Sequence, residues 1–150
     1  MTSFDILRII RYTGWSYESF AVLHQARLLS YDPDTTLDMK DDMWSYILGL
    51  RSHPCIFLKD DLCSIYGAAP LSCKRYPFRL DGKLNTRSCP LPSNLLFRLS
   101  RPDIEAEEVR KEIRLHKQIV KEWNQAPGKK SECLAFLIRK ARELSGTSSG

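Results

Sequence analysis

The chain has 150 residues and a mass of 17.3 kDa, the size of one ordinary domain. Its hydrophobic content of 43% and charged content of 27% exclude a disordered, collagen-like or coiled-coil chain. The formal net charge of +5 is uneven, since residues 1–54 carry 5 basic and 7 acidic side chains and residues 55–150 carry 18 and 11.

The charge and the apolar patterning of the sequence also predict which partners the protein binds and where it is located. The sequence pI of about 9.0 permits nucleic-acid contact. However, no basic run exceeds two residues and no nucleic-acid motif is recognisable, which favours a basic soluble surface. No apolar run approaches the ~20 residues of a membrane span, so no membrane association is predicted. Acidic and basic residues interrupt the apolar stretch at the N-terminus, which predicts no secretory signal and a cytoplasmic protein.

A short helix is predicted over residues 3–13. Ser3 is a suitable cap, Asp5 lies in the first turn, and an apolar stripe follows at Ile6, Ile9 and Ile10. Gly14 suits the left-handed residue that follows a helix.

The next segments are predicted as a second helix and then strands. A helix over residues 17–29 begins after Ser16 as cap and carries His24 beside its apolar face, where a histidine is most often packed. Residues 30–36 form a polar loop. Loose alternation over residues 37–50 predicts one or two strands.

The composition differs over residues 53–102, where six of the eight prolines lie. Such a stretch excludes long helices and central strands. We expect short elements: a strand over 55–58, a turn over 59–61, a short helix from Pro70 to Cys73, and a hairpin at Asp81–Gly82.

Two further helices are predicted in the C-terminal part. The first covers residues 103–125, with Asp103 as cap and Pro127–Gly128 after its end. His116 lies among charged residues of this helix and is expected to be solvated. The second helix covers residues 132–144, and Cys133 falls on its buried face as a structural thiol.

The expected fold is therefore a small α+β single domain over residues 1–144, mainly helical. A Pro-rich irregular cysteine segment, residues 53–92, is flanked by N-terminal helices and by a C-terminal helical part, residues 103–144. Residues 145–150 are expected to be a flexible tail.

Cysteine is the unusual residue type, since four of the five cysteines lie between residues 55 and 89. Four thiolates suffice for a tetrahedral zinc site or an iron–sulfur cluster. Nearby basic residues would offset the charge of the cluster and favour the thiolate form. The alternative is four buried cysteines acting as small hydrophobes. His53 is a less favoured replacement ligand. The candidate metal ligands are Cys55, Cys63, Cys73 and Cys89.

The residues between these cysteines resemble a known family. Cys55-Ile-Phe-Leu58, Cys63-Ser-Ile-Tyr66 and the stretch from Pro70 to Phe78, which contains Cys73-Lys-Arg-Tyr-Pro77, are similar to the YkgJ-like cysteine-cluster family of zinc- or iron-chelating domains. Cys89 sits where a further cysteine of that family is expected. The resemblance covers about residues 3–92. It departs from the family at Ala69, where arginine is usual, and in lacking the cysteine cluster that precedes the family's first helix.

The resemblance implies a metal-binding protein whose four-cysteine zinc or iron–sulfur site has a structural or redox role, with the reaction unknown. An enzyme using the site directly is less favoured, because no phosphate loop, nucleotide fingerprint or nucleophile–base pair is visible. A further alternative is a metal-free degenerate family member that acts as a basic interaction or nucleic-acid-binding module.

Overall fold

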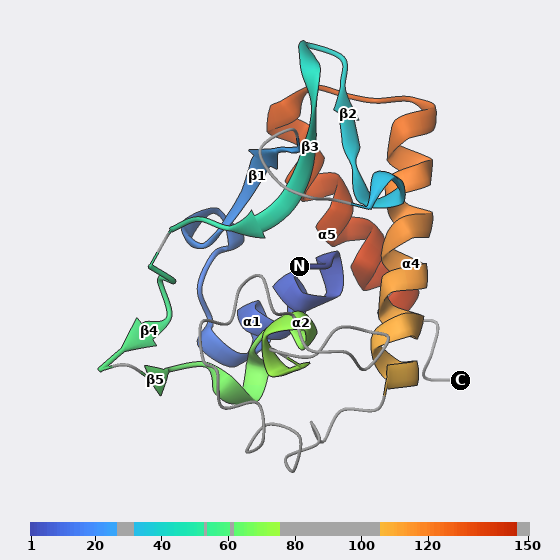
Figure 1. Ribbon diagram of the computed structural model, residues 1–150. Coiled ribbons are helices and arrows are strands. Elements are labelled where there is room, and N and C mark those ends of the chain that lie inside the picture. The colour runs from blue at the N-terminus through green and yellow to red at the C-terminus, as the bar shows by residue number, and fades with distance from the viewer. Residues whose placement is uncertain (27–31, 53, 61, 76–105, 147–150) are drawn as a thin grey trace, which may run out of the picture.

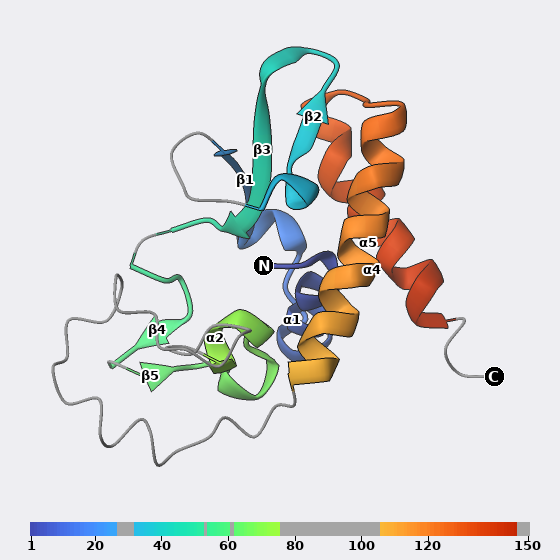
Figure 2. The ribbon, with the colours of Figure 1, turned by 45° about the vertical axis from the view of Figure 1, so that its right-hand side comes forward.

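The structure is a computed structural model and describes residues 1–26, 32–52, 54–60, 62–75 and 106–146. Helices and small antiparallel sheets occur together, so the expected α+β class is confirmed (Figure 1). Helix α1 (Ser3–Thr13) lies below the three-stranded sheet and packs against α4 (Ala106–Gln125) and α5 (Lys130–Gly146), while a two-stranded hairpin lies beside α2 (Leu71–Arg75) (Figures 1 and 2). No helix of the described residues is long and apolar enough to cross a membrane.

The first helix, α1, spans Ser3–Thr13, as predicted. Its cap is Thr2 rather than Ser3, which corrects the prediction by one residue. Thr2 Oγ1 accepts from the Asp5 amide at 3.1 Å, and Asp5 Oδ2 accepts from the Thr2 amide at 2.8 Å, which completes a capping box. Gly14 ends the helix in the left-handed region at φ 71°, where a residue without Cβ is favoured.

The predicted helix over residues 17–29 is wrong. A short 3-10 helix, η1 (Tyr17–Ser19), is followed by strand β1 (Ala21–Gln25). β1 pairs antiparallel with a strand more than 20 residues away, from Ala21 opposite Leu50 to Gln25 opposite Tyr46. This pairing satisfies the β1 backbone, and residues 27–31 lie outside the described residues.

The strands expected within residues 37–50 are confirmed as β2 (Leu37–Met39) and β3 (Asp42–Leu50). They follow a 3-10 helix, η3 (Pro33–Thr35), and form a sheet in the order β1-β3-β2. The outer edge of β2 is covered by α4, because the Asp38 amide donates to Asn124 Oδ1 at 3.0 Å and the Asp38 carbonyl accepts from Trp123 Nε1 at 2.7 Å.

The cysteine segment forms short elements where it is described. They are β4 (Leu58–Lys59), β5 (Leu62–Cys63), the 3-10 helix η4 (Tyr66–Ala68) and α2 (Leu71–Arg75). The strand predicted over residues 55–58 is wrong for all but Leu58, because the chain enters the hairpin through a turn in which the Leu58 amide donates to the Cys55 carbonyl. The short helix predicted after Pro70 is confirmed as α2. The hairpin predicted at Asp81–Gly82 lies outside the described residues.

The C-terminal helices are α4 (Ala106–Gln125) and α5 (Lys130–Gly146). α4 ends where predicted, and residues 103–105 lie outside the described residues. α5 begins before and ends after the predicted 132–144, so it includes the first two residues of the expected tail.

One buried apolar core joins the helices to the larger sheet. α1 contributes Ile6, Leu7 and Ile9, and the sheet contributes Leu23, Leu37, Tyr46 and Leu48. The C-terminal helices close it with Ile119, Val120, Trp123, Cys133, Leu137, Ile138 and Ala141. This core holds the first turn of α1 against the middle of α4.

Candidate functional site

Three of the four predicted metal ligands lie within the described residues, and all three are exposed free thiols. Cys55 precedes the β4–β5 hairpin, Cys63 ends β5, and Cys73 lies in α2. Cys89 and the alternative ligand His53 lie outside the described residues. The fourth described cysteine, Cys133, is 0% exposed, which confirms its prediction as a buried thiol.

The hairpin between these cysteines is attached to the core by two apolar side chains. Phe57 is buried, with its ring centroid 5.5 Å from that of Trp15 and 5.7 Å from that of Phe20. Ile65 is buried on the other side of the hairpin. The two strands are exposed, so the exposed thiols of Cys55 and Cys63 lie on or next to a short element that Phe57 and Ile65 anchor to the core.

Cys55 and Cys73 lie within electrostatic range of each other. Partial burial of the Cys73 thiol raises its pKa, and the negative charges of Asp5 and Cys55 raise that pKa further. Among the residues the structure describes, no three His, Cys, Asp or Glu side chains are close enough together to hold a metal ion. The thiols fit zinc or iron by type, whereas the described geometry assembles fewer than three ligands.

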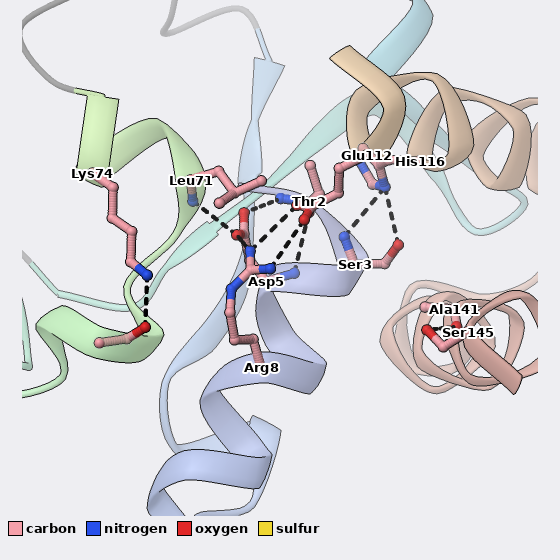
Figure 3. Close-up of polar contacts among 11 residues, drawn as sticks. Thr2, Ser3, Asp5, Arg8, Leu71, Lys74, Glu112, His116, Ala141 and Ser145 are labelled. Atoms are coloured by element: carbon pink, nitrogen blue, oxygen red, sulfur yellow. Dashed lines mark hydrogen bonds and ion pairs between the residues drawn. The ribbon is translucent and has the colours of Figure 1, made fainter. Parts of the chain in front are cut away.

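A second group of polar side chains lies beside α2, the helix that contains Cys73, at the place where α1, α2 and α4 meet (Figure 3). Asp5 is its central acceptor. In addition to the Thr2 amide, Asp5 accepts from the Arg8 guanidinium and, at 3.0 Å, from the Leu71 amide at the start of α2. One buried carboxylate therefore fixes α1 and α2 to each other.

Arg8 is shared between two carboxylates. Besides Asp5, it contacts Glu112 of α4 at 3.0 Å, and Glu112 also accepts from the Thr2 hydroxyl. Burial raises the pKa of Glu112, and the nearby charge of Asp5 raises it further, although Arg8 and Thr2 oppose this. Asp5 and Glu112 thus share one guanidinium, that of Arg8, in a site that is largely buried from solvent.

His116 lies one turn after Glu112 and is 2% exposed. The prediction that it is solvated is wrong. Its Nδ1 accepts from the Ser3 amide at 3.3 Å, and because a backbone amide can only donate, the ring proton lies on Nε2. Burial lowers the pKa of His116 to about 4, which keeps the ring neutral.

These residues border a cavity of about 360 Å³. Its charged side chains among the described residues are Asp5, Asp32 and Glu112, and its hydroxyl groups come from Thr2, Thr35 and Ser72. The apolar wall comprises Ile47, Leu48, Leu71, Val109 and Ile113. Met1 and His116 complete the lining. The cavity volume falls in the range of small-molecule sites.

Sequence reasoning missed this cluster, although the sequence carries a signal for it. Glu112 and His116 are four residues apart on one helix, and Asp5 and Arg8 are three apart on another, so each pair shares a helix face. The contact between the two helices spans about 100 residues of sequence and has no local signal.

No family model, curated protein or solved structure matches the chain.

Proposed function

We propose that the chain is a metal-binding protein whose ligands are Cys55, Cys63, Cys73 and Cys89, as in the YkgJ-like family that it resembles. The observation that carries the proposal is the accessibility of the three described thiols, together with the electrostatic interaction between Cys55 and Cys73. Four structural thiols without a metal role are expected to be buried, as Cys133 is. The metal is zinc or the iron of an iron–sulfur cluster, and its role is structural or redox.

Two lysines near the proposed ligands in sequence would offset the charge of a four-thiolate site. Lys59 and Lys74 each lie within a few residues of a proposed ligand. Cationic neighbours favour thiolates and offset the negative charge of a four-thiolate site. Burial is the main cause of the raised pKa of Cys73, and a bound metal would offset the smaller contribution that comes from the negative charge of Cys55.

Metal content of purified protein tests this proposal. We expect about one zinc or one iron–sulfur cluster per chain in protein prepared anaerobically without chelators. Elemental analysis with neither metal would contradict the proposal. An iron–sulfur cluster would also give visible absorption and stoichiometric sulfide, which separates the two cofactors.

A matched pair of cysteine variants tests the ligand set. We expect Cys73→Ala to lower the metal content and Cys133→Ala to leave it unchanged, because Cys133 is fully buried in α5 and is not one of the proposed ligands. Far-ultraviolet circular dichroism of both variants checks that they fold. Equal loss of metal in two folded variants would show that the ligand set is wrong.

We also propose a cytoplasmic location. The four described cysteines are free thiols, and thiols persist in reducing compartments. Alkylation of intact cells followed by mass spectrometry would find these cysteines reduced, and extensive disulfide formation would contradict the proposal.

A further inference from the structure

We propose that an exposed aromatic surface where the end of α1 meets η4 binds single-stranded RNA. The surface consists of the rings of Tyr12, Trp15 and Tyr66. Bases of the RNA stack on these rings, and its phosphates pair with cationic side chains beside them. The proposal does not rest on the metal proposed above, because none of the three residues is a proposed metal ligand.

The exposure of these rings is the first observation. The exposed fraction is 60% for Tyr12, 46% for Trp15 and 68% for Tyr66. Eight large apolar side chains are exposed among the described residues, and six of them lie within residues 12–15 and 56–66. Exposed apolar side chains that gather in one place mark an interaction site, whereas scattered ones do not.

The rings come together because the end of α1 packs against η4. The Trp15 ring lies 5.5 Å from the buried ring of Phe57, which holds Trp15 in place. The Tyr12 ring lies beside the backbone of Gly67, since a Cβ built at Gly67 would be 3.7 Å from that ring. Tyr66 directly precedes Gly67 in η4. Rings that packing already holds lose little conformational freedom when a ligand binds.

Positive charge around the rings favours an anionic partner. Arg11 is exposed next to Tyr12, and Lys59 is exposed on the β4–β5 hairpin. The Lys74 ammonium donates to the Gly67 carbonyl at 2.6 Å, which places it beside the rings. Residues 11–19 and 51–75 contain five basic and three acidic side chains. Two copies of a net positive surface repel each other, which argues against self-association through it.

The type of side chain decides between anionic partners. An acidic peptide supplies carboxylates, but it has no need of three exposed rings. Every nucleobase has a flat face, and bases that stack on aromatic side chains with cations beside them are typical of single-strand binding. The bases of a duplex are already stacked on one another, so a single strand is favoured. RNA is the single-stranded nucleic acid of the cytoplasm, where we have proposed that the protein lies.

Fluorescence anisotropy of a labelled ten-nucleotide oligouridine tests the proposal on the purified chain with its metal content as isolated. We expect saturable binding that weakens with salt. A plot of log K against log salt concentration should have a slope of about −2, as contacts to three phosphates of a single strand give. An RNA duplex of equal length should bind more weakly. Absence of binding, or equal binding of the duplex, would overturn the proposal.

Variants of one ring separate stacking from charge. Tyr66→Ala should weaken oligouridine binding about fivefold or more, as the loss of one stacked base does, whereas Tyr66→Phe should bind as the wild type does. Trp44→Ala is the matched control, because Trp44 is an exposed aromatic residue of β3, in the hairpin at the other end of the molecule (Figure 1). Equal loss of binding in Tyr66→Ala and Trp44→Ala would overturn the proposal.

The cations are tested through the salt dependence. Arg11→Gln should reduce the steepness of the slope by about 0.7, the contribution of one phosphate contact, while Lys40→Gln, at an exposed lysine of the β2–β3 hairpin, should leave it unchanged. Hexaglutamate carries the charge without the bases, so it should compete only weakly with oligouridine. Competition as strong as that of unlabelled oligouridine would show a site for acidic peptides instead and overturn the proposal.

Discussion

His116 is a buried base at the contact between α1 and α4, and its burial makes the stability of the chain depend on pH. Its pKa is about 4 in the folded chain and about 6.5 in an unfolded one. Between these values the unfolded chain binds a proton that the folded chain does not. The free energy of unfolding therefore falls as the pH is lowered through this window, by up to about 3 kcal/mol from this residue.

Comparison with His116→Gln isolates this effect from the carboxylates that also titrate at low pH. The Gln amide oxygen can still accept from the Ser3 amide, but the side chain does not titrate. Urea denaturation of both proteins between about pH 4 and pH 7 should show the stability advantage of the wild type shrinking as the pH falls. A difference that does not change with pH would contradict the prediction.

The burial of this histidine could have been predicted from the sequence. His116 was expected to be solvated because Arg114 and Lys117 are its neighbours. Its spacing from Val109, Val120 and Trp123 instead matches the helical period and places it on their buried face. The same periodicity correctly predicted that Cys133 is buried with Leu137 and Ala141.

At the scale of elements, the pairing of β1 with β3 depends on a glycine. A Cβ built at Gly49 would lie 2.6 Å from Cδ2 of the His24 ring, which reaches across from β1 and hydrogen-bonds the Leu50 carbonyl at 2.9 Å. We expect Gly49→Ala to lower the free energy of unfolding by about 2 kcal/mol, because the ring must move and that hydrogen bond is strained.

A double-mutant cycle tests this steric cause. In a His24→Ala background, which removes the ring, Gly49→Ala should cost less than about 1 kcal/mol. Gly67→Ala is a control, since among the described residues its added Cβ would meet the Tyr12 ring at an ordinary 3.7 Å and nothing closer. Additive effects of the two substitutions at Gly49 and His24 would contradict the interpretation.

The same strand shows why one element could not be predicted. The residues of β1 fit a helical stripe as well as an alternating strand, and Glu18 and Ser16 provide a plausible helix start. Only the register with β3, which is remote in sequence, decides between them. By contrast, α1, α2, α4 and α5 carry their caps, breakers or apolar stripes locally, and all four were predicted.

At the scale of the whole molecule, the two parts of the chain are held by different interactions. α1, α4 and α5 share a buried core, whereas the described part of the cysteine segment has short strands attached mainly through Phe57 and Ile65. If metal binding orders this segment, as proposed, removing the metal should loosen it first, because metal–ligand bonds then offset its conformational entropy.

Hydrogen exchange with and without a chelator measures this difference. We expect amides of residues 55–89 to lose protection while those of residues 109–123 keep most of theirs. An equal response in both regions would show that the metal supports the whole fold. No response in either would show that the cysteines bind no metal.

The candidate sites show the limit of sequence reasoning at this scale. The cysteines were found from their clustering, and their accessibility in the fold agrees with a role beyond packing. The cavity could not have been predicted, because it depends on Asp5 meeting Leu71 and on Thr2 meeting Glu112, contacts between segments 66 and 110 residues apart.

The backbone amide and carbonyl of Asp38 both hydrogen-bond side chains of α4, those of Asn124 and Trp123. These two groups are therefore not available for pairing with a strand of a second chain. The Asn124 amide also donates to the Thr36 carbonyl at 2.8 Å, and the Lys40 amide donates to the Gly128 carbonyl at 2.9 Å. An uncovered strand edge is a template for pairing between molecules and for aggregation. Self-association through β2 therefore requires the end of α4 to detach first, which confines it to partly unfolded molecules.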